Sequence, residues 1–365
     1  MNKRKKQQLI LLAGIVVALL LVSFYLSRSQ PFQSGRVFSN FAVTDTANIT
    51  KVFMSDREGR EVTLDRISRS EWRLNRVHEA NNAVVNSLLR TIYNIEVKGI
   101  VPRSKHNTVI SDMAAKNTRV EIYQRVPRIR IGRLRLFPHV KMTKSYFVGG
   151  PTPDHHGTYM MMDGSERAFI TFVPGQNAFL SLRYSTRESD WRDHTILALT
   201  IQQIQSVDVE IPGRPEESYR IEKTGERTFE MFQHYDQPVT IPLDTTRVLN
   251  FLASFRSVKY EGLINDMDPM RRDSIINQVP MQTLTITAID GGVHTIKTFR
   301  RKAPHEYDEL TQQRIKWDRD RLYALINDGK DLTLCQFYVF DDILKPFTYF
   351  REDYVPDHQH HFFEQ

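Results

Sequence analysis

An internal repeat constrains the fold of this chain more than any other feature of its sequence. Segment 49–55 resembles segment 204–210, with apolar residues at the same alternate positions. In both places a turn and two further short alternating segments follow, at nearly the same offset. Alternation with a period of two indicates strands buried on one face, so each copy is predicted to begin with an antiparallel meander of three strands. The matching apolar positions are Val52 and Val207, Met54 and Val209, Val62 and Tyr219, Leu64 and Ile221, Trp72 and Phe229, and Leu74 and Met231.

In each copy the apolar spacing then changes from two to three and four residues, which indicates a helix with one buried face. Asn81 and Asp244 stand at the same place before the two segments, and both residue types are good N-caps. We therefore predict one packed helix in each copy. The apolar positions are Val85, Leu88, Leu89, Ile92 and Ile95 in the first copy and Val248, Phe251, Leu252, Phe255 and Val258 in the second.

Further strands and hairpins follow each predicted helix. Segment 159–164 matches segment 323–329, with a glycine turn in each, and the pair Val120 and Ile122 matches Leu284 and Ile286. The sequence thus predicts an α+β fold with two tandem duplicated domains, each an antiparallel β-meander with one packed helix and further β-hairpins. We place the domains at residues 48–200 and 201–350, and a polar, His-bearing tail at 351–365.

The amino-terminal residues carry a second constraint. A basic segment, residues 1–8, precedes an uncharged apolar run from Leu9 to Leu26. These 18 residues rise about 27 Å as a helix, close to the hydrocarbon thickness of a bilayer. We predict a transmembrane helix at 9–27 and a polar tether at 28–47. The alternative is a cleaved secretory signal, which usually has a shorter apolar region followed by small residues.

Charge around this run predicts the orientation of the protein. Four basic residues at 3–6 precede the run and only Arg28 follows it closely, which favours a cytoplasmic amino terminus. The bulk of the chain is then expected in the periplasm, held in a bacterial inner membrane by Leu9–Leu26. These five basic residues also account for most of the formal net charge of +7, so the pI of 9.3 does not indicate a nucleic-acid partner. Cys335, the only cysteine, lies in an alternating segment and is predicted to be a buried apolar residue.

The order of elements, the junction Trp191-Arg192-Asp193 with Ile196-Leu197, and the anchor resemble an uncharacterised bacterial family. Its members carry an amino-terminal membrane helix followed by repeated β-rich domains of unknown function. Several are encoded beside ABC-transporter components of the gliding-motility auxiliary type. The resemblance covers about residues 48–350. It implies an envelope accessory protein with partners in a membrane complex, such as ABC transporter subunits, and it supplies no catalytic residue.

Other polar clusters in the sequence are explained by turns, helix starts or solvated residues. The glycine pairs at 149–150 and 291–292 lack the spacing of a phosphate-binding loop and are predicted to be loops or turns. Histidines at 155–156 and in the tail, beside Asp154 and Asp357, are interpreted as solvated residues rather than metal ligands. The segment Asp266-Met267-Asp268-Pro269 is interpreted as a turn or a helix start. We expect no catalytic residue, no cofactor and no metal.

The most distinctive polar feature is a stretch from Arg128 to Phe137 in which arginine alternates with aliphatic residues. In a strand, the arginines face one side, and Ile129, Ile131, Leu134 and Leu136 are predicted to cover a core on the other. The arginine face is either a solvated surface or a docking surface for an acidic partner, lipid headgroups or an anionic envelope polymer. The corresponding stretch 293–301 of the second copy is less regularly basic. The candidate partner- or anion-docking residues are Arg128, Arg130, Arg133, Arg135, Lys141 and Lys144.

Together these observations predict a non-enzymatic, single-pass cell-envelope protein that acts as a scaffold or accessory subunit of a membrane complex such as an ABC-type exporter. One alternative is an extracytoplasmic binding module for anionic glycan or lipid. Another is a hydrolase acting on envelope polymers, which would require a deep polar pocket with two acids or a His–acid pair of perturbed pKa.

Overall fold

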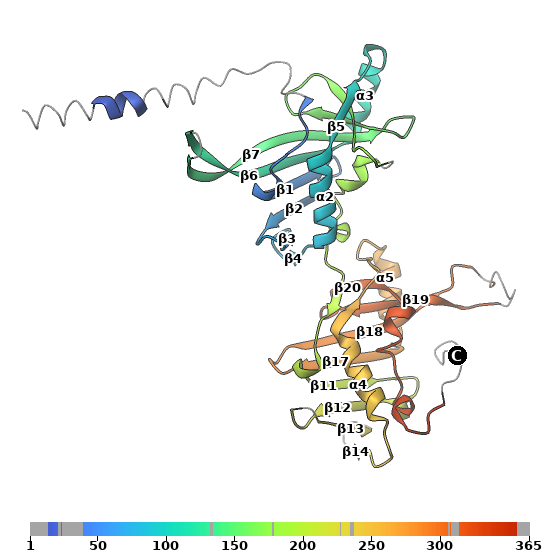
Figure 1. Cartoon of the computed structure of the whole chain (residues 1–365). Helices are drawn as coiled ribbons and strands as arrows, with labels where there is room; N and C mark the ends of the chain where they lie inside the picture. Colours follow the sequence, from blue (N-terminus) through green and yellow to red (C-terminus); the bar gives the residue numbers. More distant parts are fainter. Residues whose placement is uncertain are drawn as a thin grey trace, which may run out of the picture. The chain divides into compact units, whose positions relative to one another are not determined.

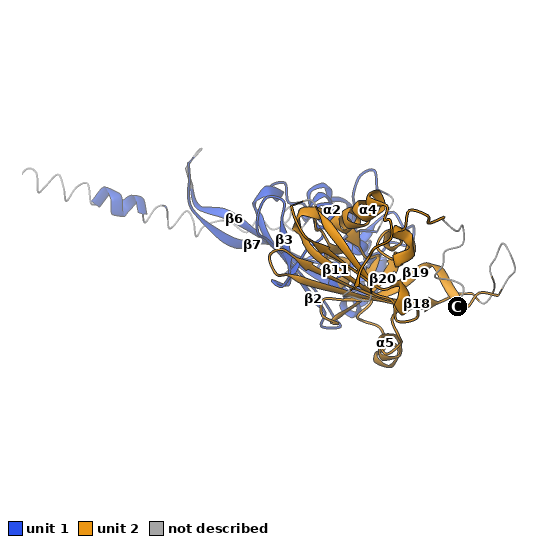
Figure 2. Cartoon of the chain, turned by 90° about the horizontal axis from the view of Figure 1, so that it is seen from below, with its two compact units in different colours: residues 1–188 blue, residues 189–365 orange. Residues whose placement is uncertain are grey.

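The computed structural model describes residues 14–20, 23, 39–131, 134–176, 179–226, 228–233, 237–305, 307 and 314–355 (Figure 1). The chain divides into two compact units, residues 1–188 and 189–365, which Figure 2 shows in different colours. Among the described residues, each unit is built on a nine-stranded antiparallel sheet with a few helices. The predicted β-rich fold with two large antiparallel sheets and packed helices is confirmed at this level.

Among its described residues, unit 1 holds the first sheet and two α-helices, besides the helical residues 14–20 and 23. Its strands are β1 (Ile49–Asp56), β2 (Glu61–Arg66), β3 (Trp72–Leu74), β4 (His78–Glu79), β5 (Glu96–Ile100), β6 (Thr118–Ile131), β7 (Leu134–Pro151), β8 (Thr158–Met162) and β9 (Ala168–Phe172). Its helices are α2 (Asn82–Asn94) and α3 (Arg103–Ala115). Short 3-10 helices are η2 (Thr46–Asn48), η3 (Leu180–Arg183) and η4 (Glu188–Asp190), the last of which crosses into unit 2.

Unit 2 holds the second sheet, a small two-stranded sheet and three α-helices. Its strands are β10 (Thr195–Leu197), β11 (Ile204–Glu210), β12 (Tyr219–Lys223), β13 (Phe229–Gln233), β14 (Gln237–Pro238), β15 (Val258–Lys259), β16 (Gly262–Leu263), β17 (Gln282–Ala288), β18 (Val293–Lys302), β19 (Trp317–Ile326) and β20 (Asp331–Gln336). Its helices are α4 (Thr245–Ser254), α5 (Pro269–Ile276) and α6 (Phe337–Phe340), with 3-10 helices η5 (Ile201–Gln203), η6 (Pro215–Glu217), η7 (Phe255–Ser257) and η8 (Phe347–Phe350).

The two large sheets share one strand order, which is the arrangement that the repeat predicts. It reads β4-β3-β2-β1-β6-β7-β8-β9-β5 in unit 1 and β14-β13-β12-β11-β17-β18-β19-β20-β16 in unit 2. A register shift also recurs, directly after Ile49 in β1 and directly after Ile204 in β11. Corresponding residues pair alike: Val52 with Leu64 and Ile122, and Val207 with Ile221 and Ile286.

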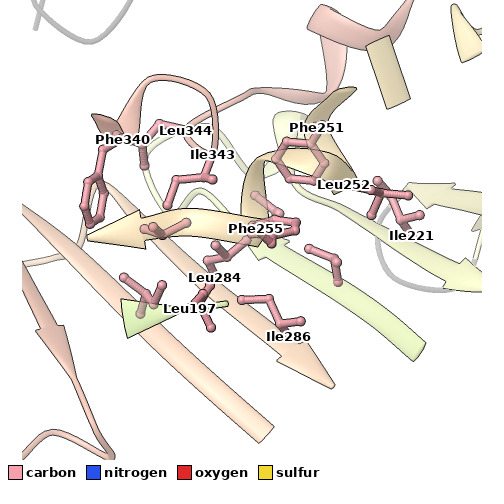
Figure 3. Close-up of a cluster of buried hydrophobic side chains, with 14 of the residues drawn as sticks. Leu197, Ile221, Phe251, Leu252, Phe255, Leu284, Ile286, Phe340, Ile343 and Leu344 are labelled. Atoms are coloured by element: carbon pink, nitrogen blue, oxygen red, sulfur yellow. The ribbon is translucent and has the colours of Figure 1, made fainter. Parts of the chain in front are cut away.

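One helix covers the middle of each sheet with the apolar face predicted from the sequence. In α2, the side chains of Leu88, Leu89 and Ile92 are buried. In unit 2, Figure 3 shows Phe251, Leu252 and Phe255 gathered with Leu284 and Ile286 of β17 in one cluster. The carboxyl-terminal segment closes the same cluster with Phe340, Ile343 and Leu344.

Both helices begin at the predicted N-caps. The Oδ1 atom of Asn81 accepts hydrogen bonds from the amides two and three residues further on, at 3.1 and 3.3 Å. Asp244 does the same at the start of α4, at 2.9 and 3.2 Å. A side-chain cap of this kind contributes about 1 kcal/mol, because it satisfies amides that have no partner within the helix.

The segment that enters each unit also packs into it. The amide of Val43 donates to the carbonyl of Ile92 at 3.0 Å, and the amide of Leu199 donates to the carbonyl of Phe255 at 3.0 Å. Phe41 and Val43 are buried, so the last part of the predicted tether contributes to the core of unit 1. The entry of the chain is therefore part of the repeated structure.

Only part of the predicted membrane helix lies within the described residues. Residues 14–20 are helical and their side chains are exposed, and residue 23 is also helical. Within the described part of the chain, we find no helix that combines the length and apolar character needed to span a bilayer. The rest of Leu9–Leu26 and the tail histidines lie outside the described residues, so the predictions made for them stay predictions.

The helix–sheet core can be tested at Leu252, which is fully buried. We expect Leu252→Ala to lower the free energy of unfolding by about 2–5 kcal/mol, because the surrounding side chains cannot fill the cavity completely. Leu249 lies on the same helix and is 39 % exposed, so Leu249→Ala is the matched control and should cost clearly less. Chemical denaturation followed by circular dichroism measures both losses. Equal losses would contradict the described packing.

Candidate functional site

The predicted basic strand lies in a long hairpin formed by β6 and β7. The neighbouring strand β1 pairs with β6 only as far as Gln124, and β8 pairs with β7 only from Tyr146 onward. Between these limits β6 and β7 pair only with each other. We call residues 125–142 the arm, of which 132 and 133 lie outside the described residues. Figures 1 and 2 both show β6 and β7 running on past the rest of the sheet in unit 1.

One face of the arm is mostly apolar and exposed, with Arg125 at its root. Residues directly opposite each other in an antiparallel pair share a face, as do alternate residues of one strand. The pairing of Ile129 with Leu136 and of Arg125 with Val140 therefore places the even-numbered residues of β7 in one row. The exposed fractions in this row are 59 % for Leu134, 37 % for Leu136, 53 % for Val140 and 42 % for Met142.

The prediction that this face covers a core is wrong for Leu134 and Leu136. The hairpin extends beyond the strands that flank it, so the described part of the chain provides no layer over these side chains. Ile129 is half-buried, and the side chain of Ile131 lies outside the described residues. Phe137, near the start of β7, is 66 % exposed and has a positive φ of 53°.

Three of the six predicted docking residues are exposed on the arm: Arg128, Arg135 and Lys141. Within the described residues, none of the three forms an ion pair. Arg130 pairs with Arg135 in the strand register, but its side chain, like the whole of Arg133, lies outside the described residues. The structure therefore brings three of the predicted residues together on the arm.

Lys144 has a different role from the one predicted. Its side chain is half-buried at the root of the arm, and its ammonium group donates a hydrogen bond to the carbonyl oxygen of Asn40. Burial lowers the pKa of Lys144. This lysine fixes the incoming chain against β7 rather than facing a partner.

No carboxylate within the sequence of the arm neutralises its charge. Residues 122–153 contain no Asp or Glu, and they contain seven basic residues. Like charges repel, so this concentration of positive charge does not stabilise an isolated fold. It creates an electrostatic field that attracts anions. The basic residues are Arg125, Arg128, Arg130, Arg133, Arg135, Lys141 and Lys144.

In unit 2 the hairpin at the same place in the strand order is β17–β18, whose strands are joined by a short turn at 289–292 that contains Asp290. The next hairpin, β18–β19, is rich in arginine but contains partners for it. Arg301 forms an ion pair with Asp318 on the opposite strand. The guanidinium carbon of Arg300 lies 5.5 Å from the ring centroid of Trp317, which is a cation–π arrangement. Among the described residues, the arginines at the end of β18 thus have partners, whereas Arg128, Arg135 and Lys141 of the arm form no ion pair.

A second candidate region is a cleft of about 650 Å³ in unit 1, beside Asp56. Burial alone would raise the pKa of this carboxyl group, but hydrogen bonds from Thr186 at 2.6 Å and from the Arg60 side chain at 2.7 Å lower the pKa to about 2. The backbone amides of Glu58 and Arg60 also donate to it. The perturbed carboxylate therefore holds the β1–β2 turn to a distant segment, which is a structural task.

The most enclosed ion pair of unit 2 also has a structural role. Asp331 receives two hydrogen bonds from the guanidinium group of Arg192, at 3.2 and 2.6 Å. The side-chain amides of Asn265 and Asn327 donate to the same carboxylate at 2.8 and 2.6 Å. Burial alone would raise the pKa of Asp331, and these four hydrogen bonds lower it instead. The pair attaches the junction segment to β20.

The other candidates from the sequence are placed as follows. Cys335 is fully buried, as predicted, and burial raises the pKa of its thiol to about 12. Asp268 caps α5 by accepting a hydrogen bond from the amide of Arg271 at 3.0 Å, which confirms the predicted helix start. Asp154 organises its own turn by accepting from Thr152 and from the amide of His156. Among the described residues, no three His, Cys, Asp or Glu side chains gather as metal ligands would.

One glycine pair was predicted correctly and the other was not. Gly291 lies in the turn between β17 and β18 with a φ of 87°. Gly149, predicted to be in a loop, lies inside β7. A Cβ at that position would lie only 2.8 Å from Cγ of Met113, so the glycine allows α3 to pack closely on the strand.

Comparison with known protein families matches residues 72–274 to a domain of unknown function, DUF4340. The match covers more than half of the chain, and the chain belongs to this family. The matched range begins in β3 of unit 1 and ends in α5 of unit 2, so it includes the junction between the units. Comparison with curated proteins and with solved structures finds no match.

The depressed pKa of Asp56 predicts a pH effect. Its pKa is 3.8 in the absence of perturbation and about 2 in the folded protein, so its hydrogen bonds stabilise the fold above about pH 4. This stabilisation is lost as the pH falls from about 4 to 2. We expect the melting temperature of Asp56→Asn to lie below that of the wild type at neutral pH, with the gap closing towards pH 2–3. The control is Glu58→Gln, whose side chain is 70 % exposed and should show little gap. A gap for Asp56→Asn that does not change with pH would contradict this role.

The exposed position of the arm's basic residues predicts that the fold tolerates reversal of their charge. We expect the triple variant Arg128→Glu, Arg135→Glu, Lys141→Glu to melt within a few degrees of the wild type, because these side chains are exposed. By contrast, Arg192→Glu should destabilise the protein strongly, because it leaves Asp331 buried beside a second negative charge. Thermal unfolding followed by circular dichroism compares the two. A collapse of the triple variant would show that the arm residues are structural.

Proposed function

We propose that this member of the DUF4340 family is a non-enzymatic, single-pass protein of the bacterial cell envelope that serves as a scaffold or accessory subunit of a membrane complex. The amino terminus is cytoplasmic in this proposal, Leu9–Leu26 spans the inner membrane, and both units lie in the periplasm. The observation that carries the proposal is the arm, which combines exposed apolar side chains with arginines and a lysine that have no ion-pair partner among the described residues.

Such a surface is typical of an interaction site. Exposed apolar residues that gather on one face mark places where proteins or membranes bind, since water contact there is unfavourable. The arm adds a positive field, which speeds and orients association with a negatively charged partner. Both properties serve docking, and neither provides a nucleophile or a proton donor for chemistry.

The perturbed groups described above also favour binding over catalysis. Strongly shifted pKa values often mark active sites, but structural ion pairs shift them too. Asp56 and Asp331 are each held by several hydrogen bonds that join distant segments, and the thiol of Cys335 is buried in the core. These groups are engaged in holding the fold, so the arm is the better candidate for function.

We infer the kind of complex from the family resemblance. Several members of the family that the sequence resembles are encoded beside ABC-transporter components of the gliding-motility auxiliary type. An ABC-type exporter is therefore the complex that we propose for this protein. The arm also favours the alternative of a binding module for an anionic glycan or lipid, because its acid-free sequence suits either negatively charged partner.

Protease accessibility tests the topology. We expect protease added to spheroplasts to digest both units and leave only a short amino-terminal fragment, because the anchor shields residues 1–8 from the outside. Antibodies against an amino-terminal tag and against unit 2 report the two ends. Protection of the carboxyl-terminal tail in intact spheroplasts would reject the proposed orientation.

Purification from membranes in a gentle detergent tests the accessory role. We expect the tagged full-length chain to co-purify with membrane subunits of one transporter in a fixed ratio. The arm triple variant should reduce the yield of this complex, and a control triple variant on the helices of unit 1 should not. The control changes Arg90, Arg103 and Lys105 to Glu, all of which are exposed. A wild-type chain that purifies without any partner would reject the accessory role.

A further inference from the structure

We propose that the arm lies in the headgroup layer of an anionic phospholipid bilayer, with its apolar face inserted and its basic residues on lipid phosphates. This inference rests on the proposed function, since the predicted anchor must hold unit 1 at the membrane. It goes further by naming the anion and by assigning separate tasks to the two faces of one hairpin.

Among the described residues, no packed layer covers the apolar face of the arm. A two-stranded hairpin without a packed layer is only marginally stable in water. Along the arm both outer strand edges lack a neighbouring strand, and Leu134 and Val140 are more than half exposed. Burying such a row removes apolar area from water, which is favourable. A partner that covers this face would therefore stabilise the arm.

The backbone of the arm favours a cover on its faces over an added strand. Pro127 and Pro138 stand opposite each other in the hairpin. Because proline has no N–H group, neither strand can donate a ladder hydrogen bond at this position. The cover that fits is one that contacts side chains, as a lipid interface does.

The side chains have the chemistry that a lipid interface selects. Apolar residues beside Lys and Arg are typical of segments that lie in the headgroup and upper acyl region, and aromatic residues such as Phe137 add interfacial contact. Arginine can bind a phosphate with two hydrogen bonds, and each basic residue near an anionic surface adds to the attraction. Arg128, Arg135 and Lys141 are exposed for this contact, and residues 122–153 contain no acid that would oppose it.

The entry of the chain places the root of the arm near the predicted anchor. Lys144, at the root, binds the carbonyl oxygen of Asn40. The predicted span ends at Leu26, so only 13 residues separate it from Asn40. A chain of this length reaches at most roughly 45 Å, and the arm itself extends about 30 Å from its root. The membrane surface is therefore within reach of the arm.

Depth-dependent quenching in nanodiscs tests this inference with the full-length chain. Cys335 is buried and its thiol has a pKa of about 12, so an introduced cysteine can be labelled selectively. We place an environment-sensitive fluorophore at Leu136→Cys on the arm. The matched control is Val77→Cys, in the β3–β4 turn of the same unit, where the native side chain is 73 % exposed. Nanodiscs contain phosphatidylcholine alone or a phosphatidylglycerol-rich mixture, with nitroxide-labelled lipid as the quencher.

In phosphatidylglycerol-rich discs, we expect the Leu136 label to shift to shorter emission wavelength and to be quenched several-fold more than the Val77 label. The difference should shrink in phosphatidylcholine discs, with added salt, and when Arg128, Arg135 and Lys141 are changed to Glu, because each change weakens charge attraction. Equal quenching in both lipid mixtures would overturn the assignment to anionic headgroups.

The remaining outcomes separate this inference from the proposed function. A chain that enters the discs while its Leu136 label stays unquenched overturns the inference and leaves the anchored accessory role intact. A photo-crosslinker at Leu136 that captures a co-purified protein subunit instead of lipid leads to the same conclusion. A chain that does not enter the discs at all overturns the anchor and this inference with it.

Discussion

Each unit depends on the burial of one helix against the middle strands of its sheet. In unit 2, Phe251 of α4 and Phe255 of η7 pack with Ile286 of β17, and α2 occupies the same place in unit 1. Since side chains alternate across a strand, a register slip of one residue would turn every apolar side chain of a strand away from the helix. This explains why two copies with different side chains keep the same pairing and even the same register shift.

The elements of this core were predictable because their signals are local. Alternation marked the strands, a change of period marked the helices, and Asn81 and Asp244 marked the helix starts. The position of β7 was harder to predict, because Gly149 suggests a loop until the close packing of α3 is known. The long-range pairs were beyond sequence spacing: Arg192 and Asp331 lie 139 residues apart, and Asp56 and Thr186 lie 130 residues apart.

The candidate site shows where such reasoning ends. The alternation around Arg128 correctly indicated strands with two unlike faces. A period states which residues share a face, but it carries no information on whether a second layer covers that face. Leu134 and Leu136 were therefore predicted to cover a core, but they lie beyond the flanking strands and are exposed. Lys144 was predicted to face a partner, but its side chain donates a hydrogen bond to the carbonyl oxygen of Asn40, where the chain enters unit 1.

The two hairpins give the strongest argument that the arm has a task outside the fold. In sheets of the same order, β17–β18 takes the place of β6–β7, and β11 pairs with β17 as far as its last residue, Ala288, whereas β1 pairs with β6 only as far as Gln124. The same strand order therefore forms without an arm. On the β18–β19 hairpin of unit 2, Arg301 forms an ion pair with Asp318, and Arg300 lies against the ring of Trp317. In unit 1, no acid occurs from residue 122 to residue 153. Repulsion among those cations works against folding, and an anion bound to the arm would remove it.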